Sequence, residues 1–189
     1  MIQNKLAEIG MMESFVGGGG SNTHEQAFLR MKDIFHQEAF AAINMESSKL
    51  RTYKLIKGEI GFESYLTTVN NIKNRIILTK IRLSNHTLMI EKGRHQNIDK
   101  KFRFCPFCPN SIEDEMHFLL ECKCFATHRN ELFLAINKKN KDTNIQFYDK
   151  NETFVYLLSK IDIISHTAHY LDKAFHTREF LLKKHKNVT

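Results

Sequence analysis

Cys105-Pro106-Phe107-Cys108-Pro109, followed by His117 and Cys122, is the stretch from which the rest of the chain is best interpreted. All four cysteines and both prolines of the 189 residues lie in this window, the last cysteine being Cys124. The spacing C-x2-C-x8-H-x4-C is typical of a metal site, because a Cys-x-x-Cys turn directs two sulfurs to one centre. We therefore predict a structural Zn2+ bound by Cys105, Cys108, His117 and Cys122.

The fourth ligand sets a condition on the local backbone. His117 is expected in the first turn of a short helix, because acidic residues precede an apolar-periodic run there. Five residues of α-helix turn through about 500°, so Cys122 shares an ion with His117 only if the helix ends or loosens near Glu121. Cys124 lies roughly 10 Å beyond His117 along such a helix and is the weaker ligand candidate.

Other interpretations of the cysteines stay open at this point. Disulfides would suit a secreted chain, but the sequence starts Met-Ile-Gln-Asn-Lys, without the apolar stretch of a secretory signal. A thioredoxin-type pair needs a preceding strand and a helix starting at Cys108, where Pro109 and Asn110 indicate a turn. Buried structural cysteines would leave the paired spacing unexplained. A hydrolase would need an ion with an open coordination position, whereas four protein ligands favour a structural ion.

Composition indicates a folded protein without a membrane partner. Apolar residues make up 42% of the chain, which argues against global disorder. No apolar run approaches the roughly eighteen residues that a membrane span requires. We expect a soluble, intracellular protein of the nucleus or cytoplasm.

The positive charge is concentrated just before the cysteines. The net charge is +7, and residues 73–103 contain nine basic side chains against two acidic ones, so this window accounts for the whole excess. A phosphate backbone would be attracted there; a solvated helix face with a basic loop is the alternative. The cations that we predict to contact RNA or DNA phosphates are Lys80, Arg82, Arg94, Lys100, Lys101 and Arg103. Phe102, Phe104 and Phe107 are candidate stacking platforms for unpaired bases, although Phe104 and Phe107 also suit packing under the knuckle.

Hydrophobic periodicity predicts helices along most of the chain. A short helix is expected over 2–15, a longer one over 24–44, and further helices after Ser48, after Asn71, over 125–136 and over 167–184. Residues 92–103 are expected to form a loop, and 137–150 a solvated connection. The predicted fold class is mainly α, a helical bundle with a small zinc-knuckle insertion.

Four segments follow from these patterns. Residues 1–22 combine the short helix with the linker at Gly17 to Gly20, which is flexible by composition. Residues 23–104 form a helical region that ends in the basic segment. Residues 105–136 contain the zinc knuckle and the helix after it. Residues 137–189 contain the C-terminal helices and a basic tail.

Several stretches of this sequence resemble one known family. They are residues 48–53, 61–66 and 90–94, Leu78-Thr79-Lys80-Ile81-Arg82-Leu83-Ser84-x-His86-x-Leu88, the Cys-x-x-Cys pair, Glu113-Asp114-Glu115-x-His117-Phe118-Leu119-Leu120-x-Cys122, and Arg129. Together they resemble the C-terminal region of non-LTR (LINE-type) retrotransposon polyproteins of animals, which follows the reverse-transcriptase domain and carries the reverse-transcriptase zinc-binding motif. The resemblance covers about 49–132, with a looser match over 6–15. In that family Cys122 is commonly followed by Pro, whereas Lys123 and Cys124 stand here.

The resemblance implies a role in holding template RNA or target DNA near a polymerase. No Tyr-x-Asp-Asp motif occurs in the 189 residues, and no endonuclease-like Pro-Asp pattern follows the knuckle. We therefore expect an accessory module without the carboxylates for two-metal catalysis, and no enzyme activity of its own. A possible partner is a reverse-transcriptase core. A rival hypothesis is a zinc-stapled helical domain that binds protein and has no nucleic-acid role.

Overall fold

The computed structural model describes residues 10, 23–45, 49–139 and 149–186. The chain divides into two compact units, Met1–Ser48 and Lys49–Thr189. The short helix expected over 2–15 lies outside the described residues apart from Gly10, and so do the glycine linker and Ser48.

The first unit contains one long helix, α3, over Thr23–Asn44. This agrees with the helix predicted over 24–44 from its apolar spacing. Phe28, Met31 and Phe35 lie on that helix and are each at least half exposed. Nothing in the described part of this unit covers these side chains.

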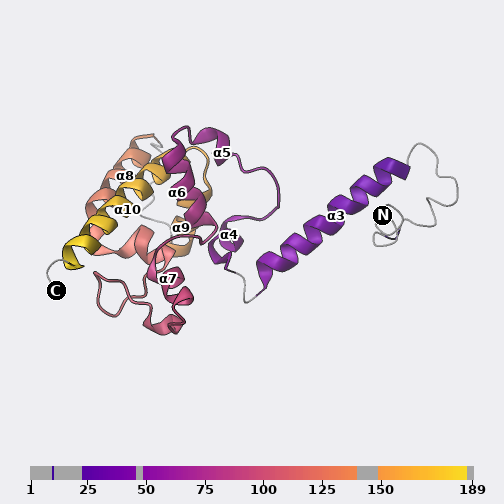
Figure 1. Ribbon diagram of the computed structural model, residues 1–189. Helices are drawn as coiled ribbons and strands as arrows, with labels where there is room; N and C mark the ends of the chain where they lie inside the picture. The colour runs from indigo at the N-terminus through magenta and orange to yellow at the C-terminus, as the bar shows by residue number, and fades with distance from the viewer. Residues whose placement is uncertain (1–9, 11–22, 46–48, 140–148, 187–189) are drawn as a thin grey trace. The chain divides into compact units, whose positions relative to one another are not determined.

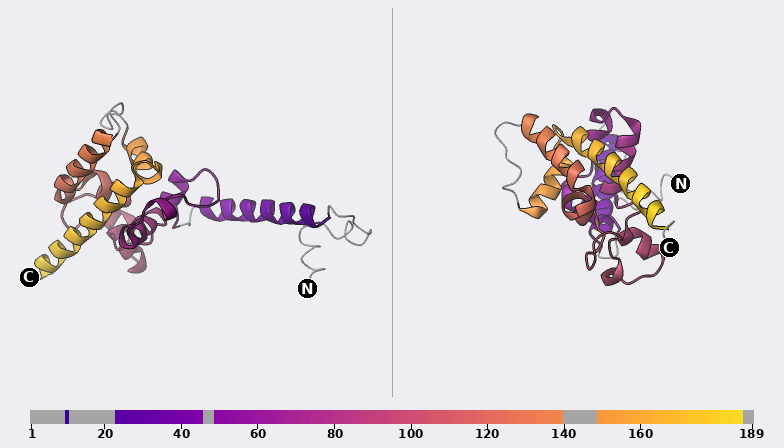
Figure 2. Two further views of the ribbon diagram at one scale, coloured as in Figure 1. Left: turned by 90° about the horizontal axis from the view of Figure 1, so that it is seen from above. Right: turned by 90° about the vertical axis from the view of Figure 1, so that its left-hand side faces the viewer.

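The second unit is built from helices, as the sequence predicted (Figures 1 and 2). Its elements, in chain order, are α4 (Arg51–Ile56), α5 (Tyr65–Thr68), α6 (Ile72–Arg82), α7 (Met89–His95), η1 (Lys100–Phe102), η2 (His117–Glu121), η3 (Lys123–Phe125), α8 (Ala126–Lys139), α9 (Lys150–Ser159) and α10 (Ile164–Lys186). Within the described residues the only extended pairing is an isolated antiparallel bridge between Phe104 and Ile112. The class is therefore mainly α.

The core of the second unit forms around α10. This helix packs against α6, α8 and α9, and Figure 1 shows it crossing the unit between α8 and α6. Side-chain N-caps stabilise the starts of two of these helices. The Asn71 side chain accepts a hydrogen bond from Asn74 N–H at α6, and the Asp149 side chain accepts hydrogen bonds from two N–H groups at α9. At the centre, the Phe118 ring lies 4.8 Å from Phe125 and 4.6 Å from Phe175, centroid to centroid. Aromatic packing thus joins the knuckle to the helices.

One predicted loop differs from the structure. The segment boundaries expected after residues 104 and 136 both lie inside the second unit, whose buried cluster includes residues on either side of each. Residues 92–95 were expected in a loop and instead belong to α7, so that prediction was wrong. The reason is a distant contact: the Glu113 carboxylate accepts from Met89 N–H at 2.7 Å, and the Glu113 carbonyl accepts from Ile90 N–H at 3.0 Å. These bonds satisfy donors at the start of α7 that its own sequence leaves unpaired.

The described helices differ from helices that span a membrane. None of them combines the length and the apolar character that would be needed to cross a lipid bilayer.

Candidate metal centre

The four predicted ligands converge in the second unit. The ligand atoms of Cys105, Cys108, His117 and Cys122 all lie within 4.8 Å of one another, and all four residues are buried. The Cys122 sulfur lies 3.9 Å from that of Cys105 and 3.7 Å from that of Cys108. These separations are much longer than a disulfide bond of about 2.05 Å, and the cysteines are free. The arrangement is a possible metal site.

The first two cysteines are placed by a tight turn. Cys105 N–H donates to the Ser111 carbonyl at 2.7 Å, and the bridge between Phe104 and Ile112 lies next to it. Asn110 closes the turn with φ of 62°, in the left-handed region that asparagine tolerates. The residues after Cys108 thus form a turn, as predicted, and not the helix start that a thioredoxin-type pair requires.

A π-helix supplies the fourth ligand. Residues His117–Glu121 form η2, a π-helix, and Cys122 N–H donates to the His117 carbonyl at 2.8 Å, an i to i+5 bond. Such a bond inserts an extra residue into the turn, so Cys122 lies nearer to one full turn beyond His117 than an α-helix would place it. In an α-helix it would point well to the side. The loosening near Glu121 that the shared site required is therefore present, and it takes the form of a π-bulge.

The His117 ring is oriented as a ligand would be. Its Nε2 is buried and has no hydrogen-bond partner among the residues that the structure describes, while Nδ1 lies 3.3 Å from a carboxylate oxygen of Glu121. Glu121 is itself ion-paired with Lys150. A carboxylate on the other ring nitrogen is the usual outer partner of a metal-binding histidine. An unpaired, buried Nε2 costs free energy unless something binds it, so the donor set fits an ion.

Electrostatics in the cluster favour an ionised sulfur. Contact with Cys122 lowers the pKa of Cys105 to about 4, with His117 contributing, although burial opposes the shift. The same contact with Cys105 raises the pKa of Cys122, and interaction with Cys105 raises the pKa of His117. The thiolate is the form of cysteine that binds metals. Cys124 is exposed and lies outside the group, in agreement with its ranking as the weaker candidate.

Two buried arginines connect the cluster to the helices around it. Arg178 of α10 makes two hydrogen bonds of 2.7 Å to the Glu113 carboxylate. Arg129 of α8 donates to the carbonyls of Leu119 and Cys122, and so holds the end of the π-helix. These arginines fix the backbone that carries two of the ligands.

Glu115 forms the second set of pairs. Its carboxylate accepts from Arg51 and from His86 Nε2, the latter at 2.7 Å, and Arg51 also bridges to Glu91. Burial alone would raise the pKa of Glu115, but the hydrogen bond from His86 and the charges of His86 and Arg51 lower it to about 2. The sequence analysis used Glu115 only as a helix-start signal before the apolar run and did not predict its buried ion pairs, whose partners Arg51 and His86 come from distant parts of the chain.

The predicted phosphate contacts fall into two groups. Lys80, Lys100 and Lys101 are exposed, and Lys101 is 3.6 Å from Asp99. Arg94 is partly exposed and pairs with Glu91 across one turn of α7. These four cations remain available at the surface.

Arg82 is buried, so its prediction as a phosphate contact was wrong. Its guanidinium donates to Glu63 at 2.6 Å and to the Leu158 carbonyl, and it lies 4.6 Å from the centre of the Tyr65 ring. A signal was present in the sequence: Arg82 follows Leu78 by four residues, on the helix face that is buried.

Arg103 is also used within the fold. It is half-buried and donates to the carbonyls of Ile98 at 2.9 Å and Ile90 at 2.7 Å. Its side chain crosses Gly93, where an added Cβ would lie only 2.7 Å from Arg103 Cγ. Arg103 therefore has a structural role in the fold, and its phosphate contact stays a prediction.

The three candidate stacking rings differ in exposure. Phe102 and Phe104 are 57% and 41% exposed, so both present ring surface to solvent. Phe107 packs edge-on against Phe125 with the centroids 6.4 Å apart. Phe107 therefore serves the knuckle, whereas the other two remain at the surface.

Comparisons of the chain with protein-family models, with curated proteins and with solved structures found no match.

Proposed function

We propose that this chain is a zinc-stabilised nucleic-acid-binding module. The observation that carries the proposal is the segment just before Cys105, which exposes Lys100, Lys101, Phe102 and Phe104 together and is anchored at the metal cluster. Cations for phosphates beside exposed aromatic rings for bases are the parts from which single-strand binding sites are made. Here the Lys101 ammonium lies 5.0 Å from the centre of the Phe102 ring.

Zinc is the ion that suits the donor set best. Three sulfurs and one imidazole are zinc ligands, and a tetrahedron with Zn–S bonds of about 2.3 Å has S–S edges of about 3.8 Å. The two S–S separations of 3.9 and 3.7 Å match that edge. Four protein donors complete the shell and leave no position for a catalytic water, which supports a structural role.

The ion would fix the nucleic-acid surface by joining it to the core. Cys105 continues directly from the exposed segment, while His117 and Cys122 belong to the turn that Arg129 holds against α8. A short segment with two exposed rings has little of its own to order it. Coordination of Cys105 would therefore reduce the entropy that this segment loses on binding.

A second basic region lies beside the knuckle. The C-terminal end of α10 carries the exposed Lys183 and Lys184, and the next residue, His185, has its ring 6.0 Å from that of Phe107. The turn between the first two cysteines therefore adjoins cations from a distant part of the sequence. These lysines extend the surface available to a phosphate backbone.

The resemblance to the tail of LINE-type reverse transcriptases supports the same role. It would make the chain an accessory module that holds template RNA or target DNA, with a reverse-transcriptase core as its partner. Because phosphate contacts dominate affinity, binding should depend strongly on salt and weakly on sequence.

A salt titration tests the proposal. Fluorescence anisotropy of labelled single-stranded RNA and duplex DNA, between about 50 and 200 mM salt, should show affinity falling by at least tenfold for several phosphate contacts. Absence of measurable binding to either nucleic acid at the lowest salt would contradict the proposal.

A protein-binding role is the second candidate, and α3 favours it. Phe28, Met31 and Phe35 recur at helical spacing and are 50–66% exposed, so this helix offers an apolar stripe that the described part of its own unit does not cover. Such stripes bind grooves or other helices. If the protein lacks nucleic-acid binding while Phe35→Ser abolishes association with a reverse-transcriptase core, this role replaces the first.

A further inference from the structure

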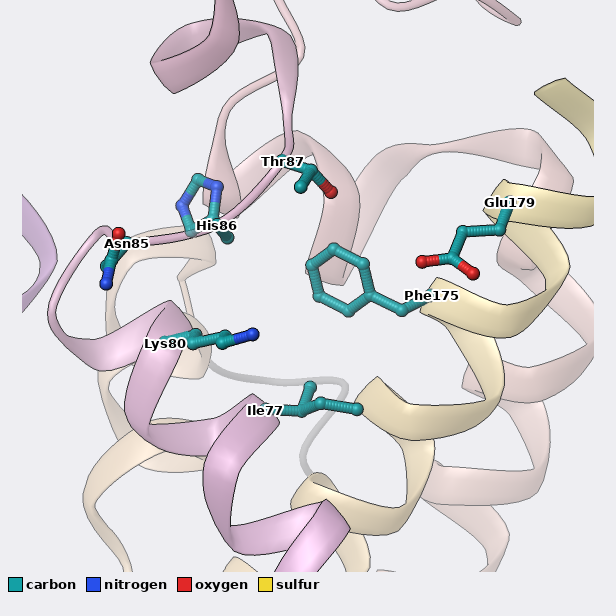
Figure 3. Close-up of a pocket in the computed structure, with 7 residues that line it drawn as sticks. All are labelled: Ile77, Lys80, Asn85, His86, Thr87, Phe175 and Glu179. Atoms are coloured by element: carbon teal, nitrogen blue, oxygen red, sulfur yellow. The ribbon is translucent and has the colours of Figure 1, made fainter.

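A cavity in the second unit lies outside the metal centre. Its volume is about 450 Å³, within the range of roughly 300–1,000 Å³ that small-molecule sites occupy. It opens between α6, α10 and the loop at residues 85–87, and its lining includes Ile77, Lys80, Thr87, Phe175 and Glu179 (Figure 3). None of these five residues coordinates the metal cluster.

The charged groups around the cavity are exposed and are not used by the fold. Among the described residues, the side chains of Lys80, Thr87 and Glu179 make no hydrogen bond or ion pair, with each other or with other groups. Figure 3 shows the Lys80 ammonium and the Glu179 carboxylate directed from opposite sides toward the space around Phe175. A cation and an anion that face one cavity without pairing suit a ligand that carries both an acceptor and donors.

The Phe175 ring forms the apolar wall of this cavity. The Phe118 ring supports it from within the core, with 4.6 Å between centroids, and Ile77 lies below it in Figure 3. A half-buried ring that is fixed on its inner side presents its remaining surface as a stacking platform at little entropic cost. The ligand should therefore contain a planar aromatic group.

The opposite wall is held in place by the fold. Asn85 N–H donates to the Lys80 carbonyl at 2.7 Å, and the His86 side chain turns away from the cavity to bond Glu115 at 2.7 Å. Ser84, just before this loop, has φ of 49°. The loop is thus held at Asn85 and His86, and Leu88 just after it is fully buried, so the cavity is preformed.

We infer that this cavity binds one unpaired guanine base of a nucleic-acid strand, with Lys80 contacting the adjoining phosphate. Guanine presents two neighbouring N–H donors on its Watson–Crick edge, which match the two oxygens of the Glu179 carboxylate. Adenine, cytosine and uracil each present an acceptor on that edge, which a carboxylate repels. The inference rests on the proposed function and adds to it a specificity that phosphate contacts do not supply.

Mononucleotides test the cavity separately from strand binding. In amide chemical-shift titrations of the full chain with GMP, AMP, CMP and UMP, GMP should shift the signals of Lys80, Thr87 and Glu179 and bind roughly tenfold tighter than UMP, as expected for a bidentate base contact. Equal binding of all four nucleotides, or GMP shifts located elsewhere, would overturn the inference.

Two variants identify the roles of the charged groups. Glu179→Gln keeps the size of the side chain but replaces one acceptor with a donor, so it should reduce the GMP preference about tenfold. Glu59→Gln, at an exposed glutamate away from the cavity, is the matched control and should leave it unchanged. Lys80→Gln should weaken GMP and UMP alike and leave guanosine, which has no phosphate, unaffected. A Glu179→Gln protein with undiminished GMP preference would refute the assignment.

A wrong assignment of guanine to the cavity and a wrong proposed function would give different experimental results. If single-stranded RNA binds with a steep salt dependence but the protein binds GMP and UMP equally well, the inference about guanine is wrong. The proposed nucleic-acid role is then unaffected. If GMP binds in the cavity but no strand binds at low salt, the cavity is a nucleotide site and the proposed function is wrong.

Discussion

The metal cluster and the basic segment at residues 73–103 adjoin in the chain but use their polar side chains in opposite ways. In the cluster, four side chains from two turns converge within 4.8 Å. In the basic segment the cations separate: Arg82 and Arg103 turn inward to carbonyls and a carboxylate, while Lys80, Lys100 and Lys101 stay in solvent. The comparison shows that Arg82 and Arg103 serve the fold while the lysines of the same charged stretch stay at the surface, together with Arg94.

The physical reason lies in the two head groups. A guanidinium offers five donors in a planar fork and is weakly hydrated, so it can be buried where several acceptors surround it. Arg129 and Arg178 follow the same pattern in α8 and α10. An ammonium is strongly hydrated and remains outside. The net charge of the segment therefore overstates the cations that it offers to a partner.

The largest expected effect comes from breaking the cluster. Cys122→Ser should release the ion and destabilise the second unit by at least about 4 kcal/mol, because loss of a structural metal removes binding free energy that contributes to folding. Metal content by mass spectrometry and thermal unfolding by circular dichroism measure this. Cys124→Ser, two residues on and outside the cluster, is the control and should change neither. Full metal occupancy in Cys122→Ser would show that the four-ligand assignment is wrong.

The next effect separates a buried arginine from an exposed lysine on the same helix. Arg82→Gln should lower the free energy of unfolding by about 3 kcal/mol, because it removes the buried guanidinium from Glu63 and leaves the Leu158 carbonyl without its partner, while Glu63 keeps its contacts with Tyr53 and Lys57. Lys80→Gln should stay within about 0.5 kcal/mol of the parent protein. Urea denaturation compares the two. Equal stabilities would contradict the structural role of Arg82.

A smaller effect tests how Arg103 is held. Gly93→Ala should cost about 1–3 kcal/mol, because the new methyl group overlaps the Arg103 side chain and that side chain must move. Combining Gly93→Ala with Arg103→Ala should remove most of the added cost in a double-mutant cycle. Strictly additive effects would mean that the two residues do not contact each other.

The smallest effect on stability is expected at the surface lysines, where binding should change. The double variant Lys100→Gln, Lys101→Gln should unfold like the parent within about 0.5 kcal/mol. Its affinity for single-stranded RNA should depend less on salt, with the log–log slope reduced by roughly one for each lost phosphate contact. Lys54→Gln, an exposed lysine on α4, serves as the control. An unchanged slope in the double variant would remove these lysines from the interface.

The sequence was most informative where structure is local. Helical spacing predicted α3, α6, α8 and α10, and cysteine spacing predicted which four side chains lie together. It was least informative where a partner comes from far along the chain. The start of α7 depends on Glu113, and the Arg82 position depends on a carbonyl in α9, neither of which a local pattern reveals.

By itself, the sequence determined the helical class and the donor set, because period and spacing act within a few residues and need no distant contact. Only the tertiary structure decided which cations stay at the surface and that α6 and α10 enclose a cavity. It also decided that a π-bulge at η2 brings Cys122 to His117. Burial and pairing depend on which elements pack together, and that choice is made by the whole core rather than by any single segment.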